Sequence, residues 1–232
     1  MLVDLARLPA PGECHLWAAR PGPDGRWSDF LSPSERVRAA ALAAGRARDV
    51  FTTSRGLQRL VAVHYLRTSA RGIRIVRDCA HCGAGHGRPR LAVDGLDYSV
   101  AHTRSWVVLA AVSEGLVGAD LDEVPNLGIV GTLAPRALTP CERNWLQRTP
   151  EEERPAEFLR LWVRKEAVAK LTGHGISAGL GRIDVRGTTA LLGGNPPAGW
   201  PPGALHLLDA PFHDGHLLAL AATRQIECVV AR

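Results

Sequence analysis

Apolar and polar positions follow two periodicities along this chain, one typical of helices and the other of strands. Apolar spacing near roughly 3.6 residues predicts helices over 33–44, 49–66, 129–137, 140–148 and 157–171. Alternating or β-branched runs predict strands over 14–19, 73–76, 98–101, 106–112, 117–121, 205–208 and 216–222. Glycine- and proline-rich stretches at 83–89 and 193–203 predict loops. This mixture of helices and strands predicts an α+β protein.

The chain also resembles itself. Leu31-Ser32-Pro33-Ser34-Glu35-Arg36 resembles Leu138-Thr139-Pro140-Cys141-Glu142-Arg143, 107 positions later. Both segments predict a helix start, with Ser or Thr as N-cap, Pro at the first helical position and Glu three residues after the cap. Two later matches, of Phe51 with Phe158 and of 106–111 with 217–222, keep nearly the same offset. Unless short patterns coincide by chance, the matches predict two similar halves, 1–116 and 117–232, with a ligand site between them.

Composition narrows the class of protein. The 232 residues are 46% hydrophobic and 22% charged, as in an ordinary globular protein. No apolar run approaches the roughly 18 residues of a membrane span, and residues 1–14 lack the apolar segment of a signal peptide. We therefore expect a cytoplasmic protein with no membrane contact. Five scattered cysteines argue against a disulfide framework.

The charge balance is basic, with a formal net charge of +5. Only Lys165 and Lys170 among the 28 basic residues are lysines, so arginine dominates. A GC-rich genome accounts for an arginine excess without any functional meaning. Arginine also suits phosphate groups, because its planar guanidinium donates paired hydrogen bonds. A basic protein favours acidic partners, whether nucleotide, nucleic acid or protein.

Asp120 and Asp122 stand two residues apart near the end of a predicted strand. Alternation along a strand places both carboxylates on one face. Two adjacent acids repel each other unless a cation lies between them, and an oxygen-only pair suits Mg²⁺. An exposed acidic turn that includes Glu123 explains the same pattern without a metal. An Asp-x-Asp pair is also the metal motif of many nucleotide-sugar glycosyltransferases.

Glu166 and Lys170 belong to the segment Trp162-Val163-Arg164-Lys165-Glu166-Ala167-Val168-Ala169-Lys170. Four residues apart on a predicted helix, their side chains share a face. Taken alone, the pair is typical of a solvated ion pair on an amphipathic helix.

Together these two segments resemble the paired signature of the Sfp-type 4′-phosphopantetheinyl transferases. The first motif of that family is Gly, aliphatic, Asp, aliphatic, then Glu or Asp, and here it reads Gly118-Ala119-Asp120-Leu121-Asp122. Ala119 stands where Ile or Val is usual, and Asp122 stands where Glu is commonest. The second motif, Trp-x-x-Lys-Glu-Ala-x-x-Lys, follows about 40 residues later and fits in full.

Three further segments resemble the family. They are Ser99 to Val107 around His102 and Thr103, the loop Gly87-Arg88-Pro89, and the helix start from Ser32 to Arg38. The resemblance thus spans roughly 16–222. One position departs from the family, because Val50 precedes Phe51 where an arginine is frequent; Arg46, Arg48 and Arg55 are the candidate replacements.

The resemblance implies two similar α/β halves related by pseudo-two-fold symmetry, with the active site in the cleft between them. It also implies a monomer that transfers the phosphopantetheine arm of coenzyme A to a serine of an acyl or peptidyl carrier protein, in secondary metabolism. The implied metal is Mg²⁺, with Mn²⁺ as an alternative, held by Asp120, Asp122 and Glu166. Glu166 or a metal-bound water is the implied general base, and Lys170 stabilises the leaving phosphate. The coenzyme A contacts implied are Arg36, Arg38, Gly87, Arg88, Pro89, His102, Thr103, Lys165 and Lys170.

Two alternatives remain open from the sequence. A glycosyltransferase that uses Asp120 and Asp122 leaves Glu166, Lys170 and His102 without a role. A basic nucleic-acid-binding protein would use Cys79, Cys82 and His86, with His81, as a zinc knuckle. Only two tyrosines and four phenylalanines are present for base stacking, which disfavours nucleic acid.

Overall fold

The structure is a computed structural model that describes residues 7–23, 25–78, 83, 85, 87–125, 127–175, 179–213 and 215–232. The α-helices are Pro33–Ala41 (α1), Arg46–Leu66 (α2), Leu127–Ala137 (α3), Pro140–Arg148 (α4) and Arg154–Thr172 (α5). The 3₁₀ helices are Ser28–Phe30 (η1), Ala70–Gly72 (η2), Glu151–Glu153 (η3) and Leu180–Arg182 (η5). The strands are Glu13–Ala19 (β1), Ile75–Val76 (β2), Arg90–Leu91 (β3), Asp97–His102 (β4), Val107–Val112 (β5), Val117–Glu123 (β6), Ile183–Asp184 (β7), Thr189–Leu192 (β8), Leu205–Ala210 (β9), His216–Ala222 (β10) and Cys228–Ala231 (β11).

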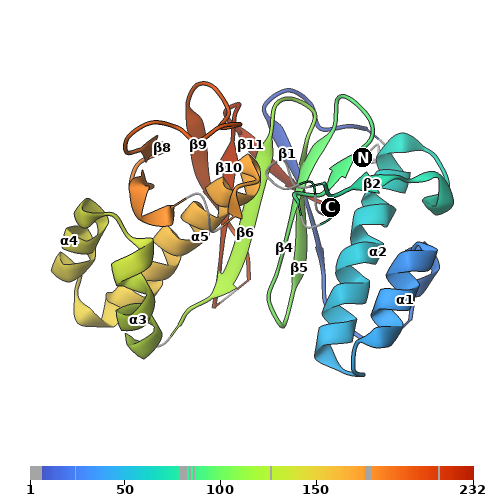
Figure 1. Ribbon diagram of the computed structural model, residues 1–232, viewed down its shortest axis with the longest axis horizontal. Coiled ribbons are helices and arrows are strands. Elements are labelled where there is room, and N and C mark those ends of the chain that lie inside the picture. The colour runs from blue at the N-terminus through green and yellow to red at the C-terminus, as the bar shows by residue number, and fades with distance from the viewer. Residues whose placement is uncertain are drawn as a thin grey trace.

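The strands form two principal sheets, each covered by its own helices (Figure 1). The first has the order β11-β1-β5-β4, and α2 packs on it. The second has the order β6-β10-β9-β8-β7, and α5 packs on β6 and β10. Strands β2 and β3 form a separate small ribbon. These elements confirm the predicted mixture of helices and strands.

The two sheets meet along the edges of β4 and β6, in the middle of the molecule (Figure 1). Side chains of β4 join them, because the Ala119 backbone N donates to Ser99 Oγ at 2.9 Å and the Val117 N donates to Asp97 Oδ2 at 2.7 Å. The strand that carries the Asp120 motif is therefore held beside the strand that ends at His102.

The C-terminal strand β11 belongs to the first sheet, where it pairs in parallel with β1. The division predicted at 116/117 assigns this strand to the second half. Its successor Arg232 donates through Nη2 to His15 Nε2 at 3.2 Å, and His15 Nδ1 lies 2.7 Å from the Tyr65 hydroxyl. The end of the chain thus contacts the core of the first sheet.

Both predicted helix starts are confirmed, since Ser32 with Glu35 and Thr139 with Glu142 form reciprocal capping boxes. The bounds of α4 and β10 match the prediction, and α2 begins three residues earlier than predicted. Sequence reasoning missed β3, β7, β8 and β11, which have two to four residues each and carry too little periodicity to detect.

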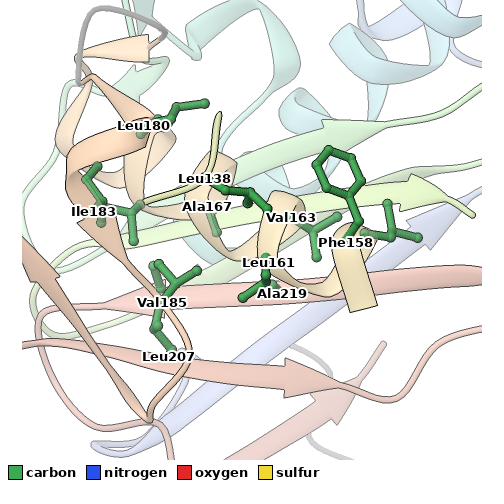
Figure 2. Close-up of a cluster of buried hydrophobic side chains, with 14 of the residues drawn as sticks. Leu138, Phe158, Leu161, Val163, Ala167, Leu180, Ile183, Val185, Leu207 and Ala219 are labelled. Atoms are coloured by element: carbon green, nitrogen blue, oxygen red, sulfur yellow. The ribbon is translucent and has the colours of Figure 1, made fainter. Parts of the chain in front are cut away.

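Helix α5 rests directly on the second sheet. Phe158, Leu161 and Ala167 of this helix lie in one buried cluster with Leu207 and Ala219 of the sheet (Figure 2). At Gly118 the approach is closest, because a Cβ there would lie 1.9 Å from the Ala167 carbonyl oxygen. The glycine that opens the first motif therefore permits close contact between β6 and α5. No helix among the described residues is long and apolar enough to span a membrane.

Candidate active site

The two sequence motifs meet where α5 lies on β6. Asp120 lies in the middle of β6 and is 8% exposed, whereas Asp122, two residues further on, is exposed. Lys170, in the last turn of α5, donates through Nζ to Asp120 Oδ1 at 2.6 Å. The packing of one helix on one strand thus joins side chains about 50 residues apart in the sequence.

The carboxylates in this region influence one another. Burial raises the pKa of Asp120; the ammonium of Lys170 opposes this rise, and the charge of Asp122 adds to it. Burial also raises the pKa of Glu166, and the charges of Asp120 and Asp122 raise it further. Three acids and a single lysine therefore form a local excess of negative charge.

This acidic group has the chemistry of a magnesium site, since all three side chains offer only oxygen. Among the described residues, however, no three His, Cys, Asp or Glu side chains lie close enough together to hold a metal as they stand. The ammonium of Lys170 occupies one oxygen of Asp120 instead. The donor set fits Mg²⁺ in type and charge, provided that Lys170 leaves Asp120.

A cavity of about 890 Å³ opens beside the acids and is bordered by elements of both sheets. The residues that line it are Leu42, Arg46, Ala47, Val50, Phe51, Ser54, Arg55, His102, Thr103, Arg104, Asp122 and Glu123. The structure thus brings the predicted residues His102, Thr103 and Asp122 together. The cavity is referred to below as the main cleft.

Arg55 on α2, one of the three candidate replacements for the arginine absent at Val50, lines the main cleft. Its guanidinium and that of Arg38 lie 5.4 and 5.6 Å from the centre of the Phe51 ring. Burial, together with the charge of Arg77, lowers the pKa of Arg55 to about 10. Within the described residues Arg55 forms no ion pair. The combined result is a half-buried cluster of positive charge that favours an anionic ligand. Its position one turn after Phe51 is the sequence signal that points to it.

His102 connects this cluster with the acidic group. It lines the main cleft at the end of β4, and partial burial lowers its pKa, as do the charges of Lys170 and Arg55. A neutral imidazole at this position can still donate one hydrogen bond to an oxygen of a ligand.

A second, smaller cavity of about 240 Å³ brings the predicted loop Gly87-Arg88-Pro89 beside Lys170. The guanidinium of Arg88 is already engaged there. Its Nη2 donates to Asp97 Oδ2 and, at 2.6 Å, to the Val117 carbonyl oxygen. Arg88 therefore joins β4 to β6, and its predicted contact with the nucleotide phosphate has no support in this arrangement.

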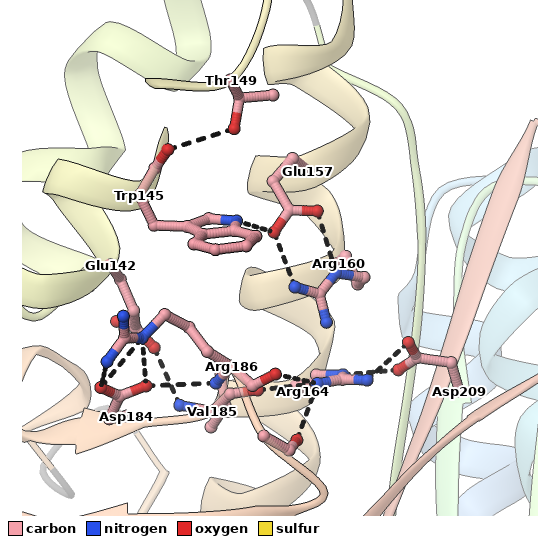
Figure 3. Close-up of polar contacts among 11 residues, drawn as sticks. Glu142, Trp145, Thr149, Glu157, Arg160, Arg164, Asp184, Val185, Arg186 and Asp209 are labelled. Carbon is pink, nitrogen blue, oxygen red and sulfur yellow. Dashed lines mark hydrogen bonds and ion pairs between the residues drawn. The ribbon is translucent and has the colours of Figure 1, made fainter. Parts of the chain in front are cut away.

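Lys165 corrects the prediction from the sequence. It is fully buried, pairs with Glu142 at 2.7 Å, and donates to the carbonyl oxygens of Leu180 and Ile183. The prediction that Lys165 contacts coenzyme A is wrong, because its amine points into the core. Figure 3 shows Glu142 also accepting from the Val185 backbone N, while Arg164 is held by Asp209.

Arg36 and Arg38, predicted together, lie in different places. Arg38 faces Phe51 at the main cleft, whereas Arg36 donates to the Ser28 carbonyl oxygen and lines a separate cavity with Arg59. A two-residue step on a helix turns the side chain by about 200°, which explains the separation. The predicted zinc ligands Cys79, His81, Cys82 and His86 lie outside the described residues.

A known protein family matches the part of the chain that carries this site. The sequence model of the 4′-phosphopantetheinyl transferase superfamily matches residues 116–194, which include β6 and α5. The resemblance seen in the two motifs is confirmed, because this matched region contains both of them.

The individual proteins that match are also named 4′-phosphopantetheinyl transferases. The chain is 28% identical to the 4′-phosphopantetheinyl transferase HetI of Nostoc over 173 residues, 71% of this chain and 70% of the relative. It is 35% identical to the transferase psf-1 of Bacillus pumilus over 103 residues, 44% of this chain and 43% of the relative. The transferase gsp of Aneurinibacillus migulanus matches at 29% over 39% of this chain and 37% of its own. These matches support neither the glycosyltransferase nor the nucleic-acid alternative.

Proposed function

We propose that this protein transfers the 4′-phosphopantetheine group of coenzyme A to a serine hydroxyl of an acyl or peptidyl carrier protein. The observation that carries the proposal is the meeting of Asp120, Glu166 and Lys170 beside a cleft that contains His102. The named relatives are 4′-phosphopantetheinyl transferases, which agrees with this chemistry.

Asp120, Asp122 and Glu166 are the residues that would hold Mg²⁺, or Mn²⁺ in its place. When bound, such an ion neutralises pyrophosphate oxygens and the charge that develops on them during transfer. The mutual repulsion of the three acids supports this assignment, because a cation between them would relieve it.

Glu166 takes the proton of the attacking serine. The serine oxygen forms a bond to the phosphorus that carries the pantetheine arm. The bond from that phosphorus to the bridging oxygen breaks, and 3′,5′-ADP leaves. Lys170, one turn beyond Glu166, stabilises the charge on the leaving phosphate.

The cations of the main cleft hold the nucleotide end of coenzyme A. His102 donates to the pyrophosphate and Thr103 lies beside it. Arg38 and Arg55, on either side of the helix turn that carries Phe51, bind the phosphate at the far end. Arg55 thereby replaces the arginine that is frequent in the family at the position of Val50.

The carrier protein reaches this site from the open side of the cleft. Val124 and Ile129 follow Asp122 in the sequence and are 47% and 45% exposed. Apolar side chains next to a catalytic cleft are suited to contact a helical partner. The net charge of +5 would speed the encounter with an acidic carrier.

We further propose that the chain is a monomer of two halves, 1–116 and 117–232, related by a pseudo-two-fold axis with the active site in the cleft between them. The two capping boxes and the parallel use of α2 and α5 support this relation.

The test is the intact mass of a carrier protein incubated with coenzyme A, Mg²⁺ and the enzyme. Wild type should add one phosphopantetheine group, whereas Glu166→Gln and a chelator control should add none. A carrier with its acceptor serine changed to alanine controls for non-specific modification. No mass gain on acyl or peptidyl carriers, together with no thermal shift on adding coenzyme A, would contradict the proposal.

A further inference from the structure

Lys170 forms an ion pair with Asp120 that has no role in the proposed transfer reaction. In this structure its ammonium rests on Asp120 Oδ1 at 2.6 Å, and the side chains of the two residues are 32% and 12% exposed. The amine that should stabilise the leaving phosphate thus occupies an oxygen that should bind the metal. A metal ion at this site would compete with the amine for Asp120, and a phosphate would compete with Asp120 for the amine.

Strand β6 and helix α5 are closely packed beside this pair. A Cβ on Gly118 would lie 1.9 Å from the Ala167 carbonyl oxygen and 2.6 Å from the Leu171 N, so β6 and α5 are already in contact there. Lys170 precedes Leu171 and is held by the same turn. A change of partner for its amine must therefore come from rotation of the flexible lysine side chain.

A new partner lies within reach of that rotation. Lys170 lines the small cavity with Gly87, Pro89 and Gly173, and its charge lowers the pKa of His102, which lines the main cleft. The amine stands between the acidic group and the region where phosphate oxygens are expected. Leaving Asp120 would bring it toward those oxygens without any movement of the helix.

We infer that Lys170 is a built-in counter-ion for the metal site, which Mg²⁺ displaces from Asp120 and which then binds a phosphate of coenzyme A. The inference rests on the proposed function. It makes the metal and coenzyme A mutually dependent: each one releases a group that the other needs. By thermodynamic reciprocity, coenzyme A must strengthen Mg²⁺ binding by the same factor by which Mg²⁺ strengthens coenzyme A binding.

The chain is well suited to a direct test, because Lys165 and Lys170 are its only lysines. Protein labelled with ¹³C and ¹⁵N in lysine alone gives two sets of side-chain signals. Lys165, fully buried and paired with Glu142, serves as the internal reference. The Lys170 signals should shift on saturation with Mg²⁺ and again on addition of coenzyme A, while the Lys165 signals stay in place.

Calorimetric titration of Mg²⁺ with and without coenzyme A measures the coupling. In the wild type coenzyme A should raise the Mg²⁺ affinity by about tenfold. In Lys170→Met the Mg²⁺ affinity without coenzyme A should rise several-fold, and the coupling should fall clearly below the wild-type value, to the part that comes from direct contact between the ion and the pyrophosphate. Arg104→Gln is the control. It removes a positive charge from the main cleft, and among the described residues Arg104 forms no ion pair with these acids, so this variant should keep the wild-type coupling.

Unchanged Lys170 signals at saturating Mg²⁺, or full coupling in Lys170→Met, would overturn the inference. If Lys170→Met is unstable, Lys170→Gln gives the same comparison, and the wild-type lysine signals need no variant. The carrier mass assay separates this result from the function. Transfer by wild type without displacement of Lys170 refutes only the inference, and displacement without transfer to any carrier refutes only the proposed function.

Discussion

Helices α2 and α5 cover different sheets, yet each divides its basic side chains in the same way. On α2, Arg59 donates to the capping glutamate Glu35 at 2.7 Å, while Arg55 faces the main cleft. On α5, Lys165 pairs with the capping glutamate Glu142, also at 2.7 Å, while Lys170 faces the acids. One cation on each helix therefore ties a neighbouring helix start to it, and one is left for chemistry.

The two ties differ in burial. Glu142 and Lys165 are both 0% exposed, whereas Glu35 and Arg59 retain 11% and 7%. Glu35 also lies near Arg77, while Glu142 accepts a bond from the Val185 backbone instead. The comparison teaches that a shared sequence pattern does not assign roles. Within one motif, Lys165 is buried against Glu142, whereas Lys170 pairs with Asp120 of the candidate site.

The largest expected effect is a loss of stability when the buried ion pair between Lys165 of α5 and Glu142 is broken. Lys165→Met should lower the free energy of unfolding by about 3–5 kcal/mol, because it leaves the Glu142 charge buried without its cation. Chemical denaturation monitored by circular dichroism measures the change. Folded Lys165→Met should still bind coenzyme A with wild-type affinity, since its amine does not reach the cleft. A selective loss of coenzyme A binding with unchanged stability would reverse the two lysine assignments.

The cleft lysine should show the opposite pattern. Lys170→Met should reduce kcat/KM for carrier modification by about 10²–10³, the usual cost of one lost electrostatic contact to a transition state. Its stability should fall less than that of Lys165→Met, because Lys170 is partly exposed. Steady-state kinetics and denaturation of the two variants side by side give the comparison. Equal losses of stability would show that both lysines are structural.

The tie of α2 should be weaker than that of α5. Arg59 donates to Glu35 and to the carbonyl oxygens of Ala70 and Ile73, so Arg59→Met leaves these acceptors unsatisfied. We expect a loss of about 2 kcal/mol in the free energy of unfolding. Denaturation under the conditions used for Lys165→Met measures it. A loss larger than that of Lys165→Met would contradict the ranking by burial.

The cleft cation of α2 should act on substrate binding. Arg55→Gln should raise the KM for coenzyme A by about tenfold, equivalent to about 1.4 kcal/mol. Its effect should shrink with 3′-dephospho-coenzyme A, because the phosphate it binds is then absent. Arg36→Gln, on α1 and facing another cavity, provides the contrast. An equal effect of Arg36→Gln would place the nucleotide elsewhere.

The smallest expected effect is on the pH dependence of stability, and it comes from Glu35 in the less buried ion pair with Arg59. Burial raises the pKa of Glu35, but hydrogen bonds from the Ser32 N and from Arg59 outweigh this and hold it below its ordinary value of 4.5. A lowered carboxyl pKa stabilises the fold above the ordinary value, and this contribution is lost as the pH falls through the folded-state pKa. Denaturation from about pH 6 to about pH 3 should therefore show a shallower loss of stability in Glu35→Gln than in wild type. Glu152→Gln, exposed on η3, is the control, and an unchanged slope in Glu35→Gln would refute the assignment.

Local patterns along the chain determined much of this molecule. Reciprocal hydrogen bonds within four residues define the starts of α1 and α4, so Ser32 to Glu35 and Thr139 to Glu142 were predictable. The two motifs were readable because a strand of alternating residues and one helix face place acids and amines in known relative directions. The resemblance to the 4′-phosphopantetheinyl transferases rests on the same residues.

Only the tertiary structure decided which of these side chains face the core and which face the cleft. Helix α5 is buried on most of its surface, so its periodicity does not distinguish Lys165 from Lys170. Arg88 is committed to Asp97 and Val117, and Arg55 is brought to Phe51 and His102, by contacts between strands and helices far apart in the chain. Burial and the partners available at a distance set the role of each charged group, and neither quantity is contained in local sequence.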